Sequence, residues 1–515
     1  MKSLKKRWLL VLPLVALLTL VFATPAFAQA GGPTVDTVKA SADDAVLSIN
    51  IMWMIIGGFL VFFMQAGFAL VETGFTRNKN VTHTMMMNMM VFGIGAVGYW
   101  LTGFAFQFGG VNMAYDAVTT AGAVTGPWAH SPITLGDWTG LMDSSVRLGS
   151  QFGIIGTKGF LLMGIPMTAS GIFAFFLFQM VFMDTAATIP TGSMAERLKF
   201  TGFVAMGLWV SMFIYPLVGG WVWGGGWLQN LGRITGWGNG AVDFAGSGVV
   251  HMIGGCVGLA GAMVIGPRIG KFNKDGSVNP TPGHNITIGV LGTIILFFGW
   301  FGFNPGSSLG FTGAFRNLAV IAAVNTLLAG GASACSAMAY MWLISPAKKP
   351  DAGMSVNGML AGLVAITAPC AFVAPWAAVV IGIIAGVLVC VAVVVLDKMH
   401  IDDPVGAVPV HMVNGAWGVL SVGIFANANP DTAAWNGMSS AVTGLIAGGG
   451  TQILAQATEV IAIFVTVFGL SWLFFKACHA MGLLRVSREV EIEGLDMPEM
   501  GSLAYPADWE APTGA

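Results

Sequence analysis

Charged side chains are scarce in this sequence. Asp, Glu, Lys and Arg make up 9% of its 515 residues, against about 25% in soluble proteins. So few charges cannot cover a water-facing surface, which excludes a soluble globular protein and favours lipid as the main solvent. The net charge is −2 and no long basic run occurs, so nothing points to a nucleic-acid partner.

Cysteine is also rare. The chain has 5 cysteines, an odd number, and none stands in a CxxC or CxxCH arrangement. This pattern argues against a disulfide framework, a zinc site and an attached c-type haem, and we expect no metal and no cofactor. Glycine, in contrast, is abundant at 72 residues. Small residues let membrane helices approach closely, so this abundance is typical of a tightly packed helical bundle.

The N-terminus has the pattern of a secretory signal peptide. A basic start that ends at Arg7 precedes an apolar stretch at 8–21, and Ala26-Phe27-Ala28 gives a small-residue cleavage site. We expect residues 1–28 to be removed and residues 29–45 to form a short external segment. The alternative is that the first apolar stretch is itself a transmembrane helix.

Long apolar stretches fill residues 46–480, which we interpret as one membrane domain. They are continuously apolar rather than alternating, which argues against strands. Each is long enough to cross about 30 Å of hydrocarbon as a helix. The sequence therefore predicts an all-α polytopic membrane protein with about eleven transmembrane helices. Their approximate spans are 46–72, 83–106, 159–190, 200–222, 245–266, 285–304, 314–345, 354–372, 375–397, 405–426 and 452–478.

Lys and Arg are spread unevenly over the loops between these spans. With the N-terminus outside, most of them fall in loops on the inner side, as the positive-inside rule requires. We therefore expect the N-terminus to lie outside and the C-terminus inside. Residues 108–157 then form a long external loop, and residues 481–515 a polar cytoplasmic tail.

An internal repeat relates the fifth and tenth spans. His251 lies in Val-His-Met, with Gly four and seven residues later and Asp243 eight residues earlier. His411 has the same surroundings, with Asp403 eight residues earlier. The two spans run in opposite directions, so the chain is predicted to consist of two inverted five-helix repeats plus one extra helix, a layout of many transporters.

His251 and His411 are the two histidines well inside apolar stretches. Ionisable groups there are costly and usually face a cavity, and the repeat brings the pair together near its pseudo-twofold axis. Such a pair can ligate a metal or haem, relay a proton, or orient a small hydrogen-bonding molecule. Few Cys, Asp or Glu ligands lie nearby, which disfavours the metal. A neutral histidine bonded to a neighbouring helix is the structural alternative.

Several motifs, in order along the chain, resemble those of the ammonium transporter (Amt/Mep/Rh) family. The resemblance runs from about residue 46 to about Tyr505. The motifs are Ala195-Glu196-Arg197, Asp243-Phe244-Ala245-Gly246, Val250-His251, Gly299-Trp300-Phe301-Gly302-Phe303-Asn304-Pro305-Gly306-Ser307, Asp402-Asp403-Pro404 before His411, and Leu484-Arg485-Val486-Ser487 with Glu493-Gly494-Leu495-Asp496 in the tail.

The resemblance implies how substrate would be held. NH4+ would be recruited in an external vestibule by Trp223, Ser307 and the aromatic face of Phe182, since a desolvating cation gains from aromatic rings. The rings of Phe182 and Phe303 would form a gate. Asp243 would have a structural role beside the site. Without the resemblance, these aromatic residues would be taken as interfacial or core residues.

The resemblance to the ammonium transporter family also implies a mechanism and partners. Beyond the gate, ammonia would pass an apolar pore lined by the two histidines, with separate proton transfer, and methylammonium would be a surrogate substrate. We expect a homotrimer in the cell membrane, of a bacterium, with a PII-type regulatory protein docking at the cytoplasmic face. No enzymatic activity is expected. Buried acids at Glu72, Asp184 and Glu459 have no assigned role beyond hydrogen bonds between helices.

Two other classes of function remain alternatives. An ammonium sensor would use the same fold as a receptor, although a tail of about 35 residues is short for a kinase or cyclase. A haem or metal redox protein would absorb visible light or contain metal when purified.

Overall fold

The computed structural model describes residues 34–110, 145–148, 152–436, 438 and 440–505. The chain divides into two compact units, residues 1–49 and residues 50–515. The predicted signal peptide, residues 1–28, lies outside the described residues, as does most of the predicted external loop 108–157. In the described part of the predicted external segment 29–45, the chain is helical from Val35 onward.

Ten helical stretches in the described residues are long and apolar enough to cross a membrane, and α13 is a shorter apolar helix. They are α2 (Val35–Phe75), Asn78–Phe108 with α3 (Val81–Gly98) and α4 (Phe104–Phe108), α6 (Ser170–Ser193), α7 (Phe200–Trp209) with α8 (Tyr215–Val222), η5 (Ser247–Met252) with α10 (Ile253–Ile265), α11 (Ile286–Phe303) with η6 (Pro305–Ser308), α12 (Gly313–Ala339), α13 (Ala352–Thr367), α14 (Pro375–Lys398), η8 (Val408–Val413) with α15 (Asn414–Phe425), and α16 (Gln452–Ile463) with α17 (Gly469–Ala480).

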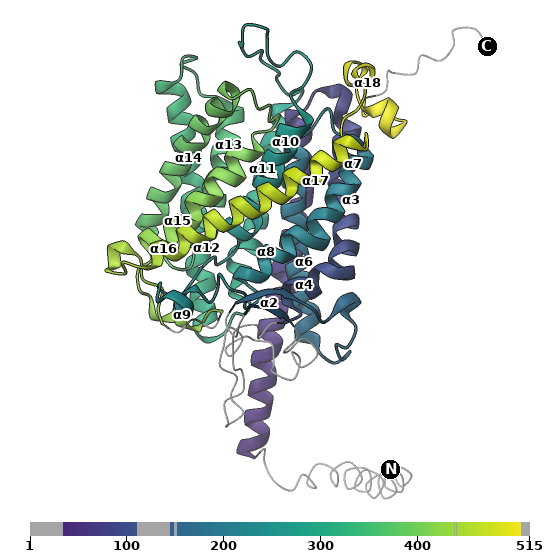
Figure 1. Cartoon of the computed structure of the whole chain (residues 1–515). Helices are drawn as coiled ribbons and strands as arrows, with labels where there is room; N and C mark the ends of the chain where they lie inside the picture. The colour runs from purple at the N-terminus through teal and green to yellow at the C-terminus, as the bar shows by residue number, and fades with distance from the viewer. Residues whose placement is uncertain (1–33, 111–144, 149–151, 437, 439, 506–515) are drawn as a thin grey trace, which may run out of the picture. The chain divides into compact units, whose positions relative to one another are not determined.

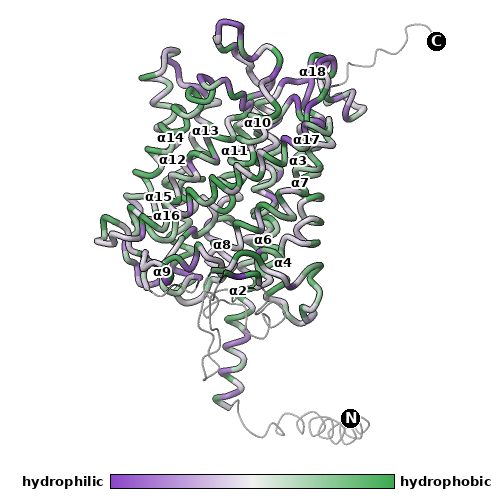
Figure 2. Tube along the Cα trace, in the orientation of Figure 1, coloured by the Kyte–Doolittle hydropathy of each residue, from purple (hydrophilic) through white to green (hydrophobic). Residues whose placement is uncertain are grey.

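Within the second unit these helices form a bundle, and α16 and α17 cross its face obliquely (Figure 1). Helix α17 packs on α10, and α16 packs on α15. Apolar residues dominate the length of the helices, while hydrophilic residues gather at the loops and around α18 (Arg488–Glu493) (Figure 2). Helices satisfy their own backbone hydrogen bonds, which is why an apolar chain of this kind crosses lipid in this form.

The repeat predicted from the two histidines has a matching local structure. His251 and His411 both lie in single π-helical segments, η5 and η8, and each segment continues into an α-helix. Gly255 lies against Met412 and Gly415 against Met252, so residue numbers rise along one helix as they fall along the other. The two segments therefore cross in antiparallel directions, as an inverted repeat requires. A side chain at either glycine would collide with the opposite backbone, so glycine allows this close crossing.

Short elements occupy the connections. Strands β1 (Ser145–Arg147) and β2 (Gly153–Gly156) pair in antiparallel fashion at the end of the predicted external loop. The other short elements are η3 (Phe160–Leu162), α9 (Leu231–Thr235), η9 (Pro430–Ala434), η10 (Leu445–Ala447) and η12 (Asp496–Met500).

A buried ion network holds together the loops on the face predicted to be cytoplasmic. Arg268 forms ion pairs with Asp402 at 2.8 Å and with Glu196 at 3.2 Å, and Glu196 also pairs with Arg77. Burial raises the pKa of Glu196, but the charges of Arg268 and Arg77 outweigh it, so the pKa lies below its ordinary value. Burial likewise raises the pKa of Asp402, and Arg197 and Arg268 more than offset it, leaving the pKa well below its usual range.

The described part of the tail is tied to the same face. The Arg485 side chain donates to the backbone oxygens of Ile265 and Pro267 and pairs with Glu491 at 2.8 Å. The carboxylate of Asp496 accepts from the backbone N–H of His83 at 2.9 Å. Residues 485–496 of the tail are thus tied to this face by specific contacts.

Candidate functional site

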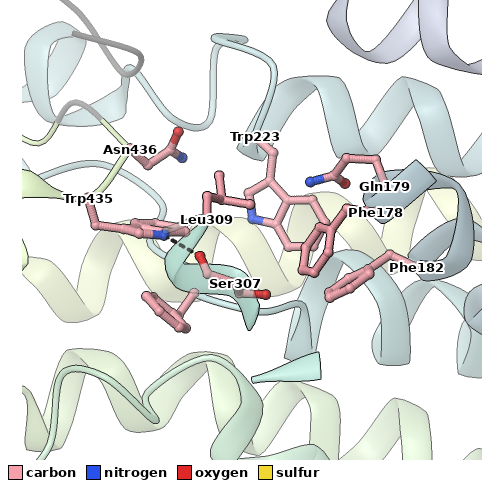
Figure 3. Close-up of a pocket in the computed structure, with 9 residues that line it drawn as sticks. Phe178, Gln179, Phe182, Trp223, Ser307, Leu309, Trp435 and Asn436 are labelled. Atoms are coloured by element: carbon pink, nitrogen blue, oxygen red, sulfur yellow. Dashed lines mark hydrogen bonds between the residues drawn. The ribbon is translucent and has the colours of Figure 1, made fainter. Parts of the chain in front are cut away.

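A small pocket in the bundle gathers the residues predicted to bind substrate. Its volume of about 20 Å³ suits a single water-sized molecule. Phe182 comes from α6, Trp223 from the end of α8, and Ser307 from η6 after α11 (Figure 3). The full lining is Phe178, Gln179, Phe182, Trp223, Phe244, Ser307, Leu309, Trp435 and Asn436.

Hydrogen bonds within the chain fix how the polar groups of this pocket point. The Ser307 hydroxyl donates to the backbone oxygen of Phe303 at 2.8 Å, so its lone pairs stay available to a cationic donor. The indole N–H of Trp223 donates to the backbone oxygen of Asp243 at 2.7 Å, and that of Trp435 to the backbone oxygen of Ser307 at 2.8 Å. Both indole donors are therefore occupied, which leaves the ring faces for a ligand.

The rings of Phe182 and Phe303 stack below the pocket. Their centroids lie 4.0 Å apart with an interplanar angle of 22°, and both side chains are fully buried. Phe178 stands 4.6 Å from Phe182 on the pocket side. The stacked pair thus lies between the pocket, which Phe182 lines, and His251, whose ring is next to that of Phe303.

The two histidines follow directly beyond the ring pair. The His251 ring lies 5.4 Å from that of Phe303 and is stacked at 5.1 Å on Trp300. His251 Nδ1 and His411 Nδ1 are 3.2 Å apart, so the contact predicted from the repeat is present. His251 Nε2 is buried without a hydrogen-bond partner. A buried nitrogen atom without a hydrogen-bond partner is costly. A small molecule in the pore that forms a hydrogen bond with this atom would therefore be bound favourably.

Asp243 shapes the start of η5 instead of lining the pocket. Its carboxylate accepts four backbone hydrogen bonds, from Gly246, Ser247, Gly248 and Val249, at 2.7 to 3.0 Å. Burial raises the pKa of Asp243 to about 6, while these four N–H groups lower it in part. Asp243 thus holds the turn that presents His251, the structural position expected for it.

Asp403 repeats this arrangement in the second half. It accepts from the backbone N–H groups of Gly406 and Val408 at 3.1 and 2.7 Å, ahead of η8. The eight-residue spacing in the sequence therefore reflects two equivalent caps, each placing one histidine.

Sequence reasoning missed part of this site. Trp435 was not predicted, because it lies in a loop with no apolar pattern, and the structure brings it to Ser307. Trp300 belongs to one of the sequence motifs, but the sequence predicted no function for it. In the structure its ring stacks on the ring of His251.

The unassigned acids lie apart from the outer pocket. Glu72 bonds to Asn88 and Thr191, which is the helix-to-helix hydrogen bonding expected for it. Asp184 Oδ1 and Glu459 Oε1 are buried without a partner.

Comparisons with known proteins agree with one another. The model of the Ammonium Transporter Family matches residues 52–505. Ammonium transporter Amt2 of Archaeoglobus fulgidus is 42% identical over 492 residues, which cover 95% of this chain and 94% of that protein. Ammonium transporter 1 member 3 of Solanum lycopersicum is 36% identical over 486 residues, 92% of this chain and 95% of that protein.

Solved structures show the same fold. A sensor Amt protein superposes with a TM-score of 0.72 at 35% identity, covering 89% of this chain and 99% of that one. Mep2 of Candida albicans, at 24% identity and a TM-score of 0.68, shares the fold. With a family match over most of its length and relatives of this similarity, the chain belongs to the ammonium transporter family.

Proposed function

We propose that this membrane protein carries ammonium across the cell membrane through the path just described. The observation that carries the proposal is the unbroken order of pocket, stacked phenyl rings and histidine pair, with each step within 4.0 to 6.2 Å between ring centroids. The pocket also has aromatic faces, one free hydroxyl acceptor and no charged group in its lining, which suits a small cation with N–H donors.

In this proposal NH4+ is recruited in the outer pocket. The faces of Phe182 and Trp223 attract the cation, a contribution of about 0.5 to 2 kcal/mol in partly desolvated sites. Ser307 accepts one N–H bond. The carboxylate of Asp243 points into its own turn and does not contact the cation, so it adds only a negative field nearby.

Passage through the gate favours a neutral species. The ring pair is fully buried, and a bare cation crossing an apolar layer loses its hydration without replacement. Ammonium avoids this cost by leaving a proton behind, whereas K⁺ has none to lose. Ammonia then meets His251 Nε2, and the histidine pair transfers the proton separately along its Nδ1–Nδ1 contact.

Uptake of labelled methylammonium into liposomes that contain the purified protein tests this function. We expect uptake that ammonium suppresses by competition and that equal K⁺ does not. Empty liposomes give the background. Uptake no faster than in empty liposomes contradicts the proposal.

We further propose that the protein works as a homotrimer in a bacterial cell membrane and that a PII-type protein docks at its cytoplasmic face. The family resemblance supports both partners. The mass of the detergent-solubilised protein tests the trimer, and co-purification with a PII-type protein at defined nucleotide levels tests the docking. The sensor alternative predicts ammonium binding without uptake in the same liposomes.

A further inference from the structure

Glu72 is a buried carboxyl group that the proposed path does not use. It lies on α2 and is 3% exposed. It lines a second cavity of about 20 Å³ together with His411, at the end of the histidine pair away from the ring gate. Apart from these two residues and Asn357, the side chains that line this cavity are apolar. A molecule that leaves His411 in this direction therefore meets one carboxyl group.

The hydrogen bonds of Glu72 suit both of its protonation states. Asn88 Nδ2 donates to Oε2 at 2.9 Å, and the Thr191 hydroxyl lies 2.8 Å from Oε1. That hydroxyl has one hydrogen, and the backbone oxygen of Thr188 is a second acceptor at 2.5 Å. When Glu72 is ionised, Thr191 donates to it. When Glu72 is protonated, Glu72 donates to Thr191, and Thr191 donates to Thr188.

The surroundings of Glu72 do not hold it permanently in the charged form. In the described part of the chain, no Lys or Arg forms an ion pair with Glu72. His411 lines the same cavity as Glu72. An ionised carboxyl group that is buried without a cationic partner is costly, so the surroundings of Glu72 leave its protonated form available.

We propose that Glu72 returns a proton to ammonia at this end of the pore. This inference rests on the proposed function. The O–H bond of Glu72 breaks, and its proton joins the nitrogen lone pair as a fourth N–H bond, leaving ammonium and a carboxylate. The carboxylate then takes up the proton that ammonium released at the gate and that the histidine pair relayed. One positive charge crosses for each ammonium, and no oxidant or reductant takes part.

Glu72→Gln separates this role from a packing role. The substitution keeps the size of the side chain and its bond to Thr191 but removes the exchangeable proton. Charge movement and labelled methylammonium uptake are measured on the same liposomes. We expect uptake within about threefold of the parent and at least a tenfold fall in charge moved per methylammonium. Glu72→Asp should restore most of the charge. Glu459→Gln, which alters another buried glutamate outside both cavities, should leave the ratio unchanged.

The outcomes are distinct. If the charge moved per methylammonium is unchanged in Glu72→Gln, whatever happens to uptake, Glu72 has a packing role and the inference is overturned. A parent protein that takes up methylammonium without moving charge overturns it as well. A parent with no uptake at all overturns the proposed function, and this inference with it. If Glu72→Gln does not assemble, Thr191→Val replaces it. We expect Thr191→Val to slow charge movement about three- to tenfold and Thr191→Ser to restore it. Equal rates of charge movement in these two variants overturn the inference.

Discussion

The imidazole rings of His251 and His411 meet through their Nδ1 atoms, 3.2 Å apart. A neutral imidazole carries one N–H, so this contact requires one ring to hold its hydrogen on Nδ1 and the other to hold it on Nε2. The two rings therefore differ in tautomer although the repeat makes them equivalent in sequence. When the donor ring takes up a proton at its Nε2, passes its Nδ1 proton to the other ring and that ring releases its own Nε2 proton, one proton has moved along the pore and the donor and acceptor rings are interchanged, which is what a relay needs.

Replacing either histidine should affect transport without affecting assembly. We expect His251→Ala and His411→Ala each to lower the ammonium-evoked current at least tenfold, because one break interrupts the relay. The control is His479→Ala, since His479 is exposed at the end of α17. The measurement is the current in liposomes, together with the elution volume of each purified variant in detergent. If both variants carry the parent's current, the relay is wrong.

The ring gate should determine selectivity against K⁺. Phe303→Ala removes one of two rings stacked at 4.0 Å and leaves a water-sized gap between pocket and histidines. We expect a K⁺-evoked current to appear and the ammonium-to-K⁺ ratio to fall at least tenfold. Phe298→Ala on the same helix is the matched control, because Phe298 is 55% exposed. A Phe303→Ala protein as selective as the Phe298→Ala protein contradicts a gating role.

The outer pocket should determine apparent affinity. Losing the Ser307 acceptor or the Trp223 ring removes about 1 kcal/mol each of cation binding, which corresponds to about a fivefold higher KM in Ser307→Ala or Trp223→Leu. The rate at saturating ammonium should change less. Trp376→Leu, on an exposed face of α14, controls for the loss of an indole. An unchanged KM in both pocket variants places the binding site elsewhere.

Much of this arrangement could be predicted from the sequence because two signals were strong. Long apolar stretches give the helices, and the spacing from Asp243 to His251, repeated at Asp403 and His411, gives the pair and its antiparallel crossing. The side chains of Phe182 and Trp223 could be assigned only through the family motifs, since periodicity cannot tell a pocket aromatic from a core aromatic.

The remainder depends on contacts between distant segments. Trp435 reaches Ser307 across 128 residues of sequence, and nothing near Trp435 in the chain marks it. How the helices pack decides that His251 Nε2 has no hydrogen-bond partner and that the Thr191 hydroxyl has two possible acceptors. Helical structure from Val35 was likewise hidden, because Asp and Lys residues near the start of α2 interrupt the apolar pattern.

The ion network on the predicted cytoplasmic face should make stability fall in acid. The pKa values of Glu196 and Asp402 lie below the ordinary values of 4.5 and 3.8. A depressed pKa stabilises the folded state above the ordinary value, and this contribution disappears as the pH falls through the folded value. We expect a Tm that is level down to about pH 4.5 and falls below it, measured by intrinsic fluorescence in detergent.

Asp402→Asn tests the same network at neutral pH. It leaves the guanidinium of Arg268, 2% exposed, without its main counter-charge, a loss of about 3 to 5 kcal/mol for a broken buried pair. The Tm at pH 7 should drop, and its decline in acid should become shallower. Asp275→Asn, in an exposed loop, is the control. Equal Tm values for the two variants would show that the network adds nothing to stability.

We expect the path through the ring gate and the histidine pair to transport ammonium and to reject K⁺. The most direct measurement is the current of the parent protein in liposomes after equal concentration jumps of ammonium and of K⁺, with the membrane otherwise unchanged. We expect a transient inward current with ammonium, a smaller one with methylammonium, and none above that of empty liposomes with K⁺. Equal currents with ammonium and K⁺, or none with ammonium, would contradict it.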